Sequence, residues 1–227
     1  FSWLIHRFTA PQHFAASAAF HRSKQSMSDI IHHIHPEFSR QLAREDKEKL
    51  LGQKGAVVWL YGMSGSGKST IANAAEKVLH QQGRMTTILD GDNLRTGLNQ
   101  HLGFSDDDRR ENIRRVSHVA KLFAQQGILT LVSVITPRQE LRDLARDVIG
   151  NDYYEVFVKA SYDLCEKRDV KGLYAKAASG EIKNFTGKGS SFEEPKNPDL
   201  IIDTEGQEIT ESVAVLLEAI HQKTSNT

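Results

Sequence analysis

The feature that most constrains this chain is the glycine-rich segment GMSGSGKS at residues 62–69, which has the spacing G-x-x-x-x-G-K-[ST]. It follows an apolar run at residues 56–61 and precedes a helical pattern that begins at Ser69. A strand, a glycine-rich turn and a helix in this order are typical of a phosphate-binding loop, or P-loop. Glycines let backbone N–H groups approach phosphate oxygens, and the helix N-terminus adds partial positive charge. The alternative is a Gly/Ser loop that binds nothing, and it leaves the flanking strand and helix unexplained.

The loop residues have expected roles in binding a nucleoside triphosphate. Lys68 is expected to reach the β- and γ-phosphates, and the Ser69 hydroxyl is expected to ligate Mg²⁺. The predicted nucleotide-binding residues of the loop are Gly62, Met63, Ser64, Gly65, Ser66, Gly67, Lys68, Ser69 and Thr70.

From residue 56 onward, strand-like and helix-like patterns alternate. We expect strands at 57–61, 85–89, 128–134, 154–158 and 200–202, and helices at 69–82, 106–126, 139–149, 161–168 and 208–221. Ser105, with Asp108 three residues later, is a capping signal for the second helix. The alternation predicts an α/β fold of P-loop NTPase type, with a parallel sheet and helices on both faces. Ligands then bind at the carboxyl ends of the strands.

Length and composition narrow the class of protein. A chain of 227 residues fits one medium domain with an appendage, and a net charge of zero predicts no general affinity for nucleic acid or a membrane surface. The single cysteine, Cys165, fits a reducing compartment and reads as a buried residue of an apolar helix. No apolar run reaches the roughly 18 residues of a membrane span.

The first 28 residues contain no Asp or Glu and are rich in Ala, Ser and Phe. This composition is typical of an organelle transit peptide, and the alternative is an extension that precedes a chain start at Met27. We expect a disordered segment at 1–28, an N-terminal arm at 29–55 and the P-loop domain at 56–227. The expected location is cytoplasmic, or organellar if residues 1–28 are a transit segment.

Two carboxylates, Asp90 and Asp92, follow the second predicted strand. At the carboxyl end of a strand beside the P-loop, they can hold Mg²⁺ or accept the proton of a substrate hydroxyl. The alternative is helix capping by Asp92 or Asn93. Because the base-selecting string Asn-Lys-x-Asp of GTPases is absent, a small-molecule kinase is the better interpretation.

Basic residues cluster after Asp92, and an aromatic residue lies among them. Arg95 and Arg109 flank Phe104, a combination that suits an anionic, planar ligand such as a nucleotide. The alternative is a solvated helix face, which would also hold Arg110, Arg114 and Arg115. Further on, the Gly-, Ser- and Lys-rich stretch 176–198 predicts a mobile loop that closes over substrate, or an ordinary surface loop.

Several uncommon strings, in this order along the chain, resemble the adenylylsulfate kinase (APS kinase) family from about Ile31 to the C-terminus. They are HHIH at 32–35, DGDNLR at 90–95, LGFS at 102–105, DRRENIRR at 108–115, RDVKGLY at 168–174 and GEIKNFTG at 180–187. The resemblance implies a homodimer, with ATP sulfurylase as a candidate partner. It also implies that ATP, with Mg²⁺, donates its γ-phosphate to the 3′-hydroxyl of adenosine 5′-phosphosulfate (APS) in sulfate assimilation, giving 3′-phosphoadenosine 5′-phosphosulfate (PAPS) and ADP.

The resemblance also implies residue roles. The implied catalytic residues are Lys68, Asp90, Asp92 and Thr136, with Asp90 favoured as the base and with Ser69 and Asp90 beside the metal. Arg168 resembles the residue that lies against the ATP adenine. Phe104 would stack on the APS adenine. The implied APS-binding residues are Asp92, Asn93, Arg95, Phe104, Arg109, Asn112, Ile135, Thr136, Lys171, Lys183, Asn184 and Phe185.

The chain departs from the family pattern after the third strand. The family has Ile-Ser-Pro, then an aromatic residue and Arg, where this chain has Ile135-Thr-Pro-Arg-Gln139. Threonine keeps the hydroxyl, and direct in-line transfer needs no covalent intermediate. The departure is the only support for an alternative function, a catalytically weak module that binds APS or PAPS. A kinase for another small hydroxyl acceptor is a further alternative.

Overall fold

In a computed structural model, the described residues are 35–169, 172–181, 186 and 192–225. The chain divides into two compact units, Phe1–Gln41 and Leu42–Thr227. The described part of the first unit contains one 3-10 turn, Phe38–Arg40, next to an exposed ion pair between Arg40 and Glu37. The domain boundaries expected from the sequence remain predictions.

The second unit is built on a five-stranded sheet in which every pairing is parallel. The strands are β1 (Ala56–Tyr61), β2 (Thr86–Asp90), β3 (Leu129–Ser133), β4 (Tyr153–Lys159) and β5 (Leu200–Asp203), in the spatial order β2-β3-β1-β4-β5. All five coincide, within a few residues, with the strands predicted from the sequence. The parallel α/β fold class is therefore confirmed.

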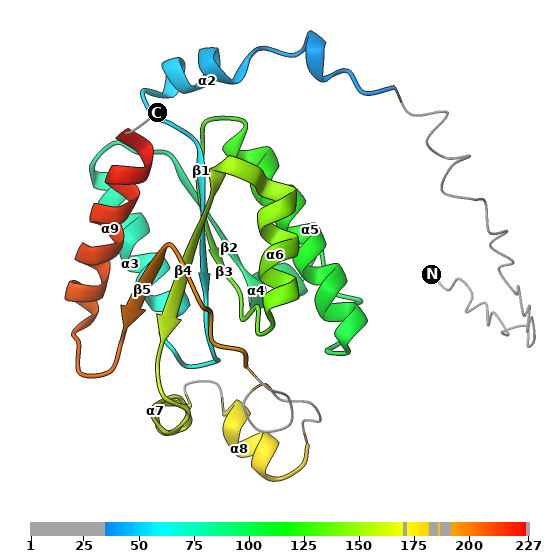
Figure 1. The fold of residues 1–227 in the computed structure, drawn as a ribbon, viewed down its shortest axis with the longest axis vertical. Coiled ribbons are helices and arrows are strands. Elements are labelled where there is room, and N and C mark those ends of the chain that lie inside the picture. The colour runs from blue at the N-terminus through cyan, green and yellow to red at the C-terminus, as the bar shows by residue number, and fades with distance from the viewer. Residues whose placement is uncertain (1–34, 170–171, 182–185, 187–191, 226–227) are drawn as a thin grey trace, which may run out of the picture. The chain divides into compact units, whose positions relative to one another are not determined.

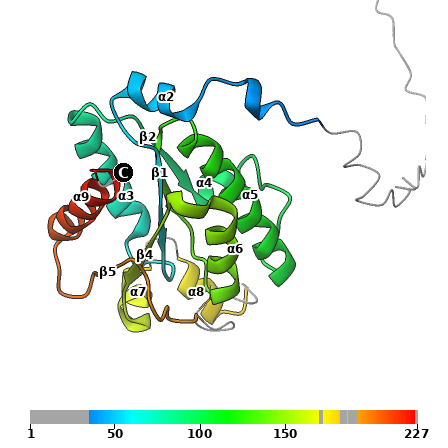
Figure 2. The same ribbon diagram turned by 45° about the horizontal axis from the view of Figure 1, so that its top comes forward.

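The helices cover both faces of this sheet (Figures 1 and 2). On one face lie α3 (Lys68–Gln81) and α9 (Ile209–Ser225), and on the other lie α5 (Asp106–Ala124) and α6 (Gln139–Ile149). The central strand β1 is fully buried and contributes side chains to the cores on both faces of the sheet, because successive side chains point to opposite faces. Val58 and Leu60 pack in the core under α3 and α9, whereas Trp59 packs under α5 and α6.

Shorter helices complete the unit. They are α2 (Arg44–Leu51), α4 (Gly91–Arg95), α7 (Tyr162–Arg168) and α8 (Leu173–Ala178), with a 3-10 turn at Gly150–Asp152. Of these four helices the sequence predicted only α7. The cap of α4 is Asp90, whose side chain accepts a hydrogen bond from Asp92 N. The sequence alternative, which placed the cap at Asp92 or Asn93, was wrong because the helix begins two residues earlier.

Different helices lie at the two ends of the sheet. Figure 1 shows α7 and α8 beyond the carboxyl ends of the strands and α2 at the opposite end.

The capping signal of α5 is present, since Ser105 Oγ accepts a hydrogen bond from Asp108 N. Part of the predicted mobile loop, residues 182–185 and 187–191, lies outside the described residues. Within the described ranges, no helix combines the length and apolar character needed to cross a bilayer.

Candidate active site

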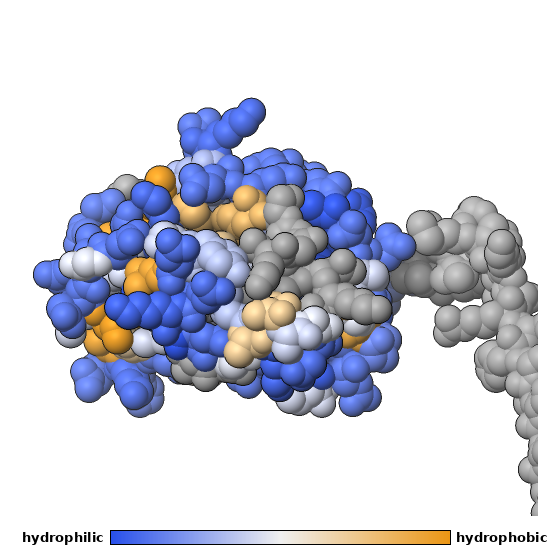
Figure 3. Space-filling view, turned by 90° about the horizontal axis from the view of Figure 1, so that it is seen from below, coloured by the Kyte–Doolittle hydropathy of each residue, from blue (hydrophilic) through white to orange (hydrophobic). Residues whose placement is uncertain are grey.

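A cavity of about 620 Å³ opens at the carboxyl ends of the strands. The surface at this end of the molecule is mostly hydrophilic, with small apolar areas among it (Figure 3). Most of the residues predicted from the sequence line this one cavity. They are Ser64, Gly65, Gly67, Lys68, Ser69, Thr70, Asp90, Asp92, Arg95, Phe104, Arg109, Asn112, Ile135, Thr136 and Arg168.

The other predicted residues fall into two groups. Gly62, Met63 and Ser66 belong to the P-loop without lining the cavity, and Asn93 lies on α4 outside the lining. Lys171, Lys183, Asn184 and Phe185 lie outside the described residues, as does most of the histidine string at 32–35.

The P-loop requires glycine at specific points. Gly62 has φ 152°, and a Cβ there would lie 2.3 Å from the carbonyl oxygen of Val158. Gly65 has φ 81°, and a Cβ there would lie 2.9 Å from the carbonyl oxygen of Cys165. The loop therefore packs directly against the backbone of β4 and of α7, which is why a side chain is excluded at both positions. Lys68 Nζ donates to the Met63 carbonyl across the loop at 2.7 Å.

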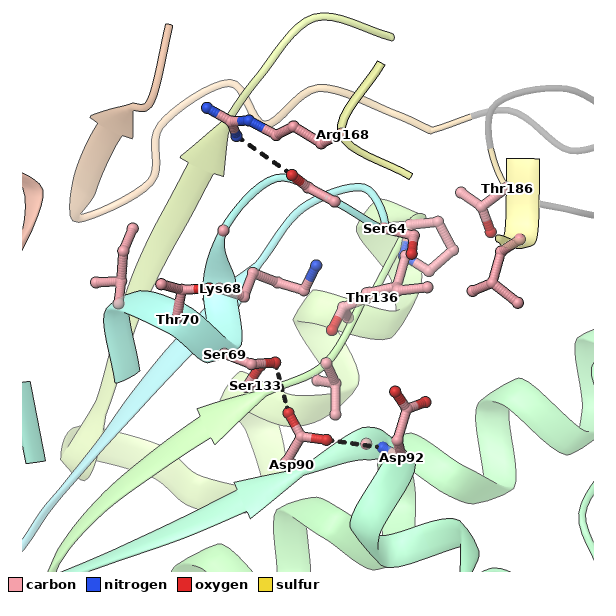
Figure 4. Close-up of a pocket in the computed structure, with 18 of the residues that line it drawn as sticks. Ser64, Lys68, Ser69, Thr70, Asp90, Asp92, Ser133, Thr136, Arg168 and Thr186 are labelled. Atoms are coloured by element: carbon pink, nitrogen blue, oxygen red, sulfur yellow. Dashed lines mark hydrogen bonds between the residues drawn. The ribbon is translucent and has the colours of Figure 1, made fainter. Parts of the chain in front are cut away.

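Three oxygens gather where α3 begins and where β2 and β3 end (Figure 4). The Ser69 hydroxyl donates to Asp90 Oδ2 at 2.6 Å and lies 3.0 Å from Ser133 Oγ. Hydroxyl and carboxylate oxygens are the donors that Mg²⁺ prefers. The donor set therefore fits this ion, and Ser133 is a member that the sequence analysis did not name. Its only signal was a serine at the end of an apolar strand.

Arg168 fastens the P-loop to the segment that follows β5. Its guanidinium donates to Gly65 O at 3.2 Å and to Thr204 Oγ1 and O at 3.1 and 3.0 Å. The Thr204 hydroxyl lies 3.1 Å from Ser66 O. Tyr174 on α8 braces the loop from another side, donating to Ser64 O at 2.7 Å. No sequence pattern marked Thr204 or gave Tyr174 a role, because both act through backbone carbonyls of the loop.

Arg95 and Arg109 form a basic wall beside an exposed aromatic ring. The Arg95 guanidinium lies 4.4 Å from the centroid of the Phe104 ring. Arg109 donates to Phe104 O at 3.0 Å and to Thr186 Oγ1 at 2.9 Å. Burial lowers the pKa of both arginines from the ordinary guanidinium value, although they stay charged at neutral pH. This wall suits an anion attached to a flat ring.

The basic cluster predicted from the sequence therefore divides. Arg114 and Arg115 both pair with Glu111 on the same helix, at 2.7 Å each. This is the solvated helix face that the sequence left as an alternative. Only Arg95 and Arg109 of the cluster line the cavity.

Asn112 is oriented by a residue that the sequence analysis did not identify. Asn99 is fully buried, and its amide nitrogen donates to Asn112 Oδ1 at 3.0 Å. With that oxygen engaged, the Asn112 NH₂ group is the part of the amide available to a ligand.

Thr136 has an unusual backbone conformation. Its φ of 43° lies in the left-handed region, which no other non-glycine residue among the described residues adopts, and its side chain is buried. β-Branched residues rarely adopt this region, and such strain is concentrated at functional sites. Trp59 Nε1 donates to Thr136 Oγ1 at 3.0 Å, and Arg142 Nη1 donates to Thr136 O at 3.1 Å. The predicted burial of Cys165 is confirmed.

Comparisons with known proteins agree with this geometry. A family profile described as adenylylsulphate kinase matches residues 54–203. The adenylyl-sulfate kinase of Bacteroides thetaiotaomicron is 53% identical over 192 residues, which is 84% of this chain and 96% of that protein. A solved APS kinase of Mycobacterium tuberculosis, in complex with AMPPNP and APS, is 48% identical with a TM-score of 0.72, covering 74% of this chain and 98% of that one. A hexameric APS kinase from Thiobacillus denitrificans is 29% identical with a TM-score of 0.57, covering 75% of this chain and 29% of that one.

Proposed function

The chain belongs to the adenylylsulphate kinase family, and from this membership we propose that it transfers the γ-phosphate of ATP to the 3′-hydroxyl of APS, giving PAPS and ADP. The single observation that carries the proposal is one cavity lined by a P-loop, by Asp90 at the end of β2 and Asp92 on α4, and by a basic wall with an aromatic ring. The first two parts suit phosphoryl transfer, and the third suits an anionic adenine nucleotide as acceptor.

The donor half holds and neutralises the triphosphate. The P-loop backbone surrounds the β-phosphate, and Lys68 exchanges its bond to the Met63 carbonyl for phosphate oxygens. Arg168, already fixed by Thr204, presents its planar guanidinium at the position proposed for the donor adenine. The protein forms no covalent bond to the phosphoryl group in this scheme. Because the transition state is loose, the protein acts by aligning the two substrates and neutralising phosphate charge.

We assign Mg²⁺ to the oxygen cluster of Ser69 and Asp90, with Ser133 behind it. When bound, the ion neutralises charge on the phosphate oxygens. Asp90 Oδ1 accepts from Asp92 N, so Asp90 is held from both sides by the protein. We therefore give Asp90 the metal-side role and Asp92, which also lines the cavity, the task of orienting the acceptor hydroxyl. The sequence had favoured Asp90 as the base, and comparison of the two Asn variants distinguishes these assignments.

The acceptor half is the wall of Arg95, Phe104 and Arg109, together with Asn112. The two guanidinium groups pair with the phosphosulfate, and the Phe104 ring stacks on the adenine. Loop residues Ile135 and Thr136 complete this side of the cavity. We keep Lys171, Lys183, Asn184 and Phe185 as proposed contacts of APS.

The test is transfer of labelled γ-phosphate from ATP and Mg²⁺ to APS, with AMP as the alternative acceptor and Lys68→Ala as the inactive control. Formation of labelled PAPS that is lost in Lys68→Ala supports the function. Labelling of AMP in preference to APS would contradict the assignment of APS as the acceptor. Absence of transfer, with both nucleotides bound, would support the catalytically weak binding module, which the intact set of cavity residues does not favour.

Assembly is a separate proposal. We propose a homodimer, and we keep ATP sulfurylase as a candidate partner. Light scattering of the purified chain tests the first, and co-purification with ATP sulfurylase tests the second.

A further inference from the structure

The strained residue Thr136 lies in a short loop that is held by different hydrogen bonds at neighbouring residues. Ile135 O accepts a hydrogen bond from Gly62 N at 3.3 Å, so the start of the loop is fixed to the P-loop. The Thr136 carbonyl accepts instead from Arg142 on α6. A conformation of this kind persists only where the surroundings determine it. Arg142 is thus a main support of the strained peptide unit.

Arg142 also reaches a second segment, the one that precedes β5. Its Nη2 donates to Glu193 O at 3.0 Å and to Gln139 Oε1 at 2.9 Å. Glu193 makes two further hydrogen bonds to this region. Its N–H donates to Pro137 O at 2.8 Å, and its carboxylate accepts from Gln139 N, at the start of α6, at 2.7 Å. One guanidinium therefore joins the cavity loop to a segment about 50 residues further along the chain.

The arrangement contains a buried charge. Arg142 is 0% exposed and Glu155 on β4 is 3% exposed, with Arg142 Nε 3.7 Å from Glu155 Oε1. Tyr61 Oη and Arg146 Nη2 each donate to Glu155 at 2.7 Å, so each oxygen of the carboxylate accepts a hydrogen bond. A buried charge is costly unless it is paired, and an apolar side chain could fill this space. What the arginine adds is a planar fork whose two ends meet two separate carbonyls.

We propose that Arg142 is a positioning residue for the acceptor substrate, acting through Thr136 and Pro137, and this inference rests on the proposed function. Arg142 is not among the cavity-lining residues, whereas Ile135, Thr136 and Pro137 are. Lysine at 142 keeps the charge but has no fork to hold Thr136 O and Glu193 O together. The loop then relaxes away from the strained conformation, and the acceptor site is lost while the P-loop keeps its own supports.

The experiment compares Arg142→Lys with Arg146→Lys, a matched control on the same helix that contacts Glu155 without touching the loop. We expect Arg142→Lys to lower kcat/KM for APS by about 10- to 100-fold, since small displacements of a reacting group have effects of this size. The KM for ATP should stay within about threefold, as should all constants of Arg146→Lys. An equal loss for both nucleotides, or the same loss in Arg146→Lys, would overturn the proposal.

Two further measurements keep the proposal testable if Arg142→Lys is poorly folded or if transfer to APS fails. The double variant Arg142→Met, Glu155→Gln removes both buried charges, and it should fold yet show the same selective loss. In a Trp3→Phe background, Trp59 fluorescence reports on the bond to Thr136, and APS should change it in the parent but not in Arg142→Lys. An APS response that survives in Arg142→Lys overturns the inference, whereas absence of transfer in the parent overturns only the proposed function.

Discussion

The Ser69 hydroxyl donates to Asp90 Oδ2 at 2.6 Å, which joins the first turn of α3 to the end of β2. These residues are 21 positions apart in sequence. Parallel pairing of β2 with β3, and of β3 with β1, brings their ends to one edge of the sheet. The contact thus combines a hydroxyl that follows the phosphate loop with a carboxylate from another strand.

We expect Asp90→Asn and Asp92→Asn to fail in different ways. Asp90→Asn should lower kcat by about 100-fold or more and raise the Mg²⁺ concentration needed for half-maximal rate, because a charged ligand is lost. Asp92→Asn should lower kcat with an unchanged Mg²⁺ requirement. The measurement is the initial rate across a Mg²⁺ titration, with Ser133→Ala as a milder neighbour. A raised Mg²⁺ requirement in Asp92→Asn alone would reverse the two assignments.

Thr204→Val tests whether the segment after β5 supports the donor site. The change keeps the shape of the side chain but leaves Arg168 Nη1 and Ser66 O without the hydroxyl. We expect a loss of about 1–3 kcal/mol in the free energy of unfolding, the usual effect of leaving buried polar groups unpaired. The KM for ATP should rise several-fold while that for APS changes little. Thr224→Val, a change near the end of α9 and away from the cavity, is the control, and equal kinetic effects of the two would contradict the prediction.

The sequence predicted the strands of the sheet and the strand–loop–helix around the P-loop well because both are local patterns. The strand at 56–61, the loop at 62–69 and the helix after it are consecutive in the chain, so spacing alone defines them. Short helices α4 and α8 were missed since each has fewer than two turns and shows no hydrophobic periodicity. Asp90 was not predicted as the N-cap of α4, because the sequence analysis gave its carboxylate a role in the site. One carboxylate oxygen caps the helix and the other accepts from Ser69 in the cavity.

The residues that hold other site residues in place could not be predicted in this way. Asn99, Arg142 and Thr204 act on Asn112, Thr136 and the P-loop from distant parts of the chain, through single hydrogen bonds. Such contacts depend on the packed tertiary structure and leave no periodic signal. The strain at Thr136 is likewise a property of the fold rather than of the string Ile-Thr-Pro.

Asn99→Asp should weaken the acceptor site without touching it. A carboxylate cannot donate to Asn112 Oδ1, so the Asn112 amide is expected to rotate and present its oxygen to the ligand. We expect the KM for APS to rise about 10-fold, with the KM for ATP unchanged, which corresponds to about one charge-assisted hydrogen bond. Steady-state kinetics with each nucleotide varied measures this. Asn99→Ser, which retains a donor, should lose less than Asn99→Asp, and the opposite order would contradict the argument.

Thr136→Ala should keep substantial activity. The hydroxyl already accepts from Trp59 Nε1, and direct phosphoryl transfer needs no covalent intermediate on this residue. Because the backbone support from Arg142 remains, we expect kcat to fall less than about 10-fold. A Thr136→Ala protein that binds APS normally but has lost transfer would show that the hydroxyl acts directly in the reaction. Thr136→Ser, which restores the family residue, is the matched control.

Glu48 links stability to pH at the end of the sheet opposite the cavity. It is 6% exposed, and its Oε1 accepts from Gly55 N at 2.9 Å and from Arg44 Nε at 2.8 Å. Burial acts to raise the pKa of Glu48, but these bonds outweigh it and hold the pKa below the ordinary 4.5. A depressed pKa in the folded state stabilises the protein above pH 4.5, and this contribution is lost as the pH falls through the folded value.

Glu48→Gln should therefore reduce the free energy of unfolding by about 1–3 kcal/mol at neutral pH, and the deficit should shrink as the pH falls below 4.5. The reason is that the wild-type carboxyl becomes protonated and loses the same charge-assisted bonds that the amide lacks. Urea unfolding at a series of pH values measures the difference between the two proteins. Glu45→Gln, at an exposed position of the same helix, should follow the wild type throughout. A Glu48→Gln deficit that stays constant into the acid range would mean that shape and packing, rather than the charge, hold α2 against the segment that precedes β1.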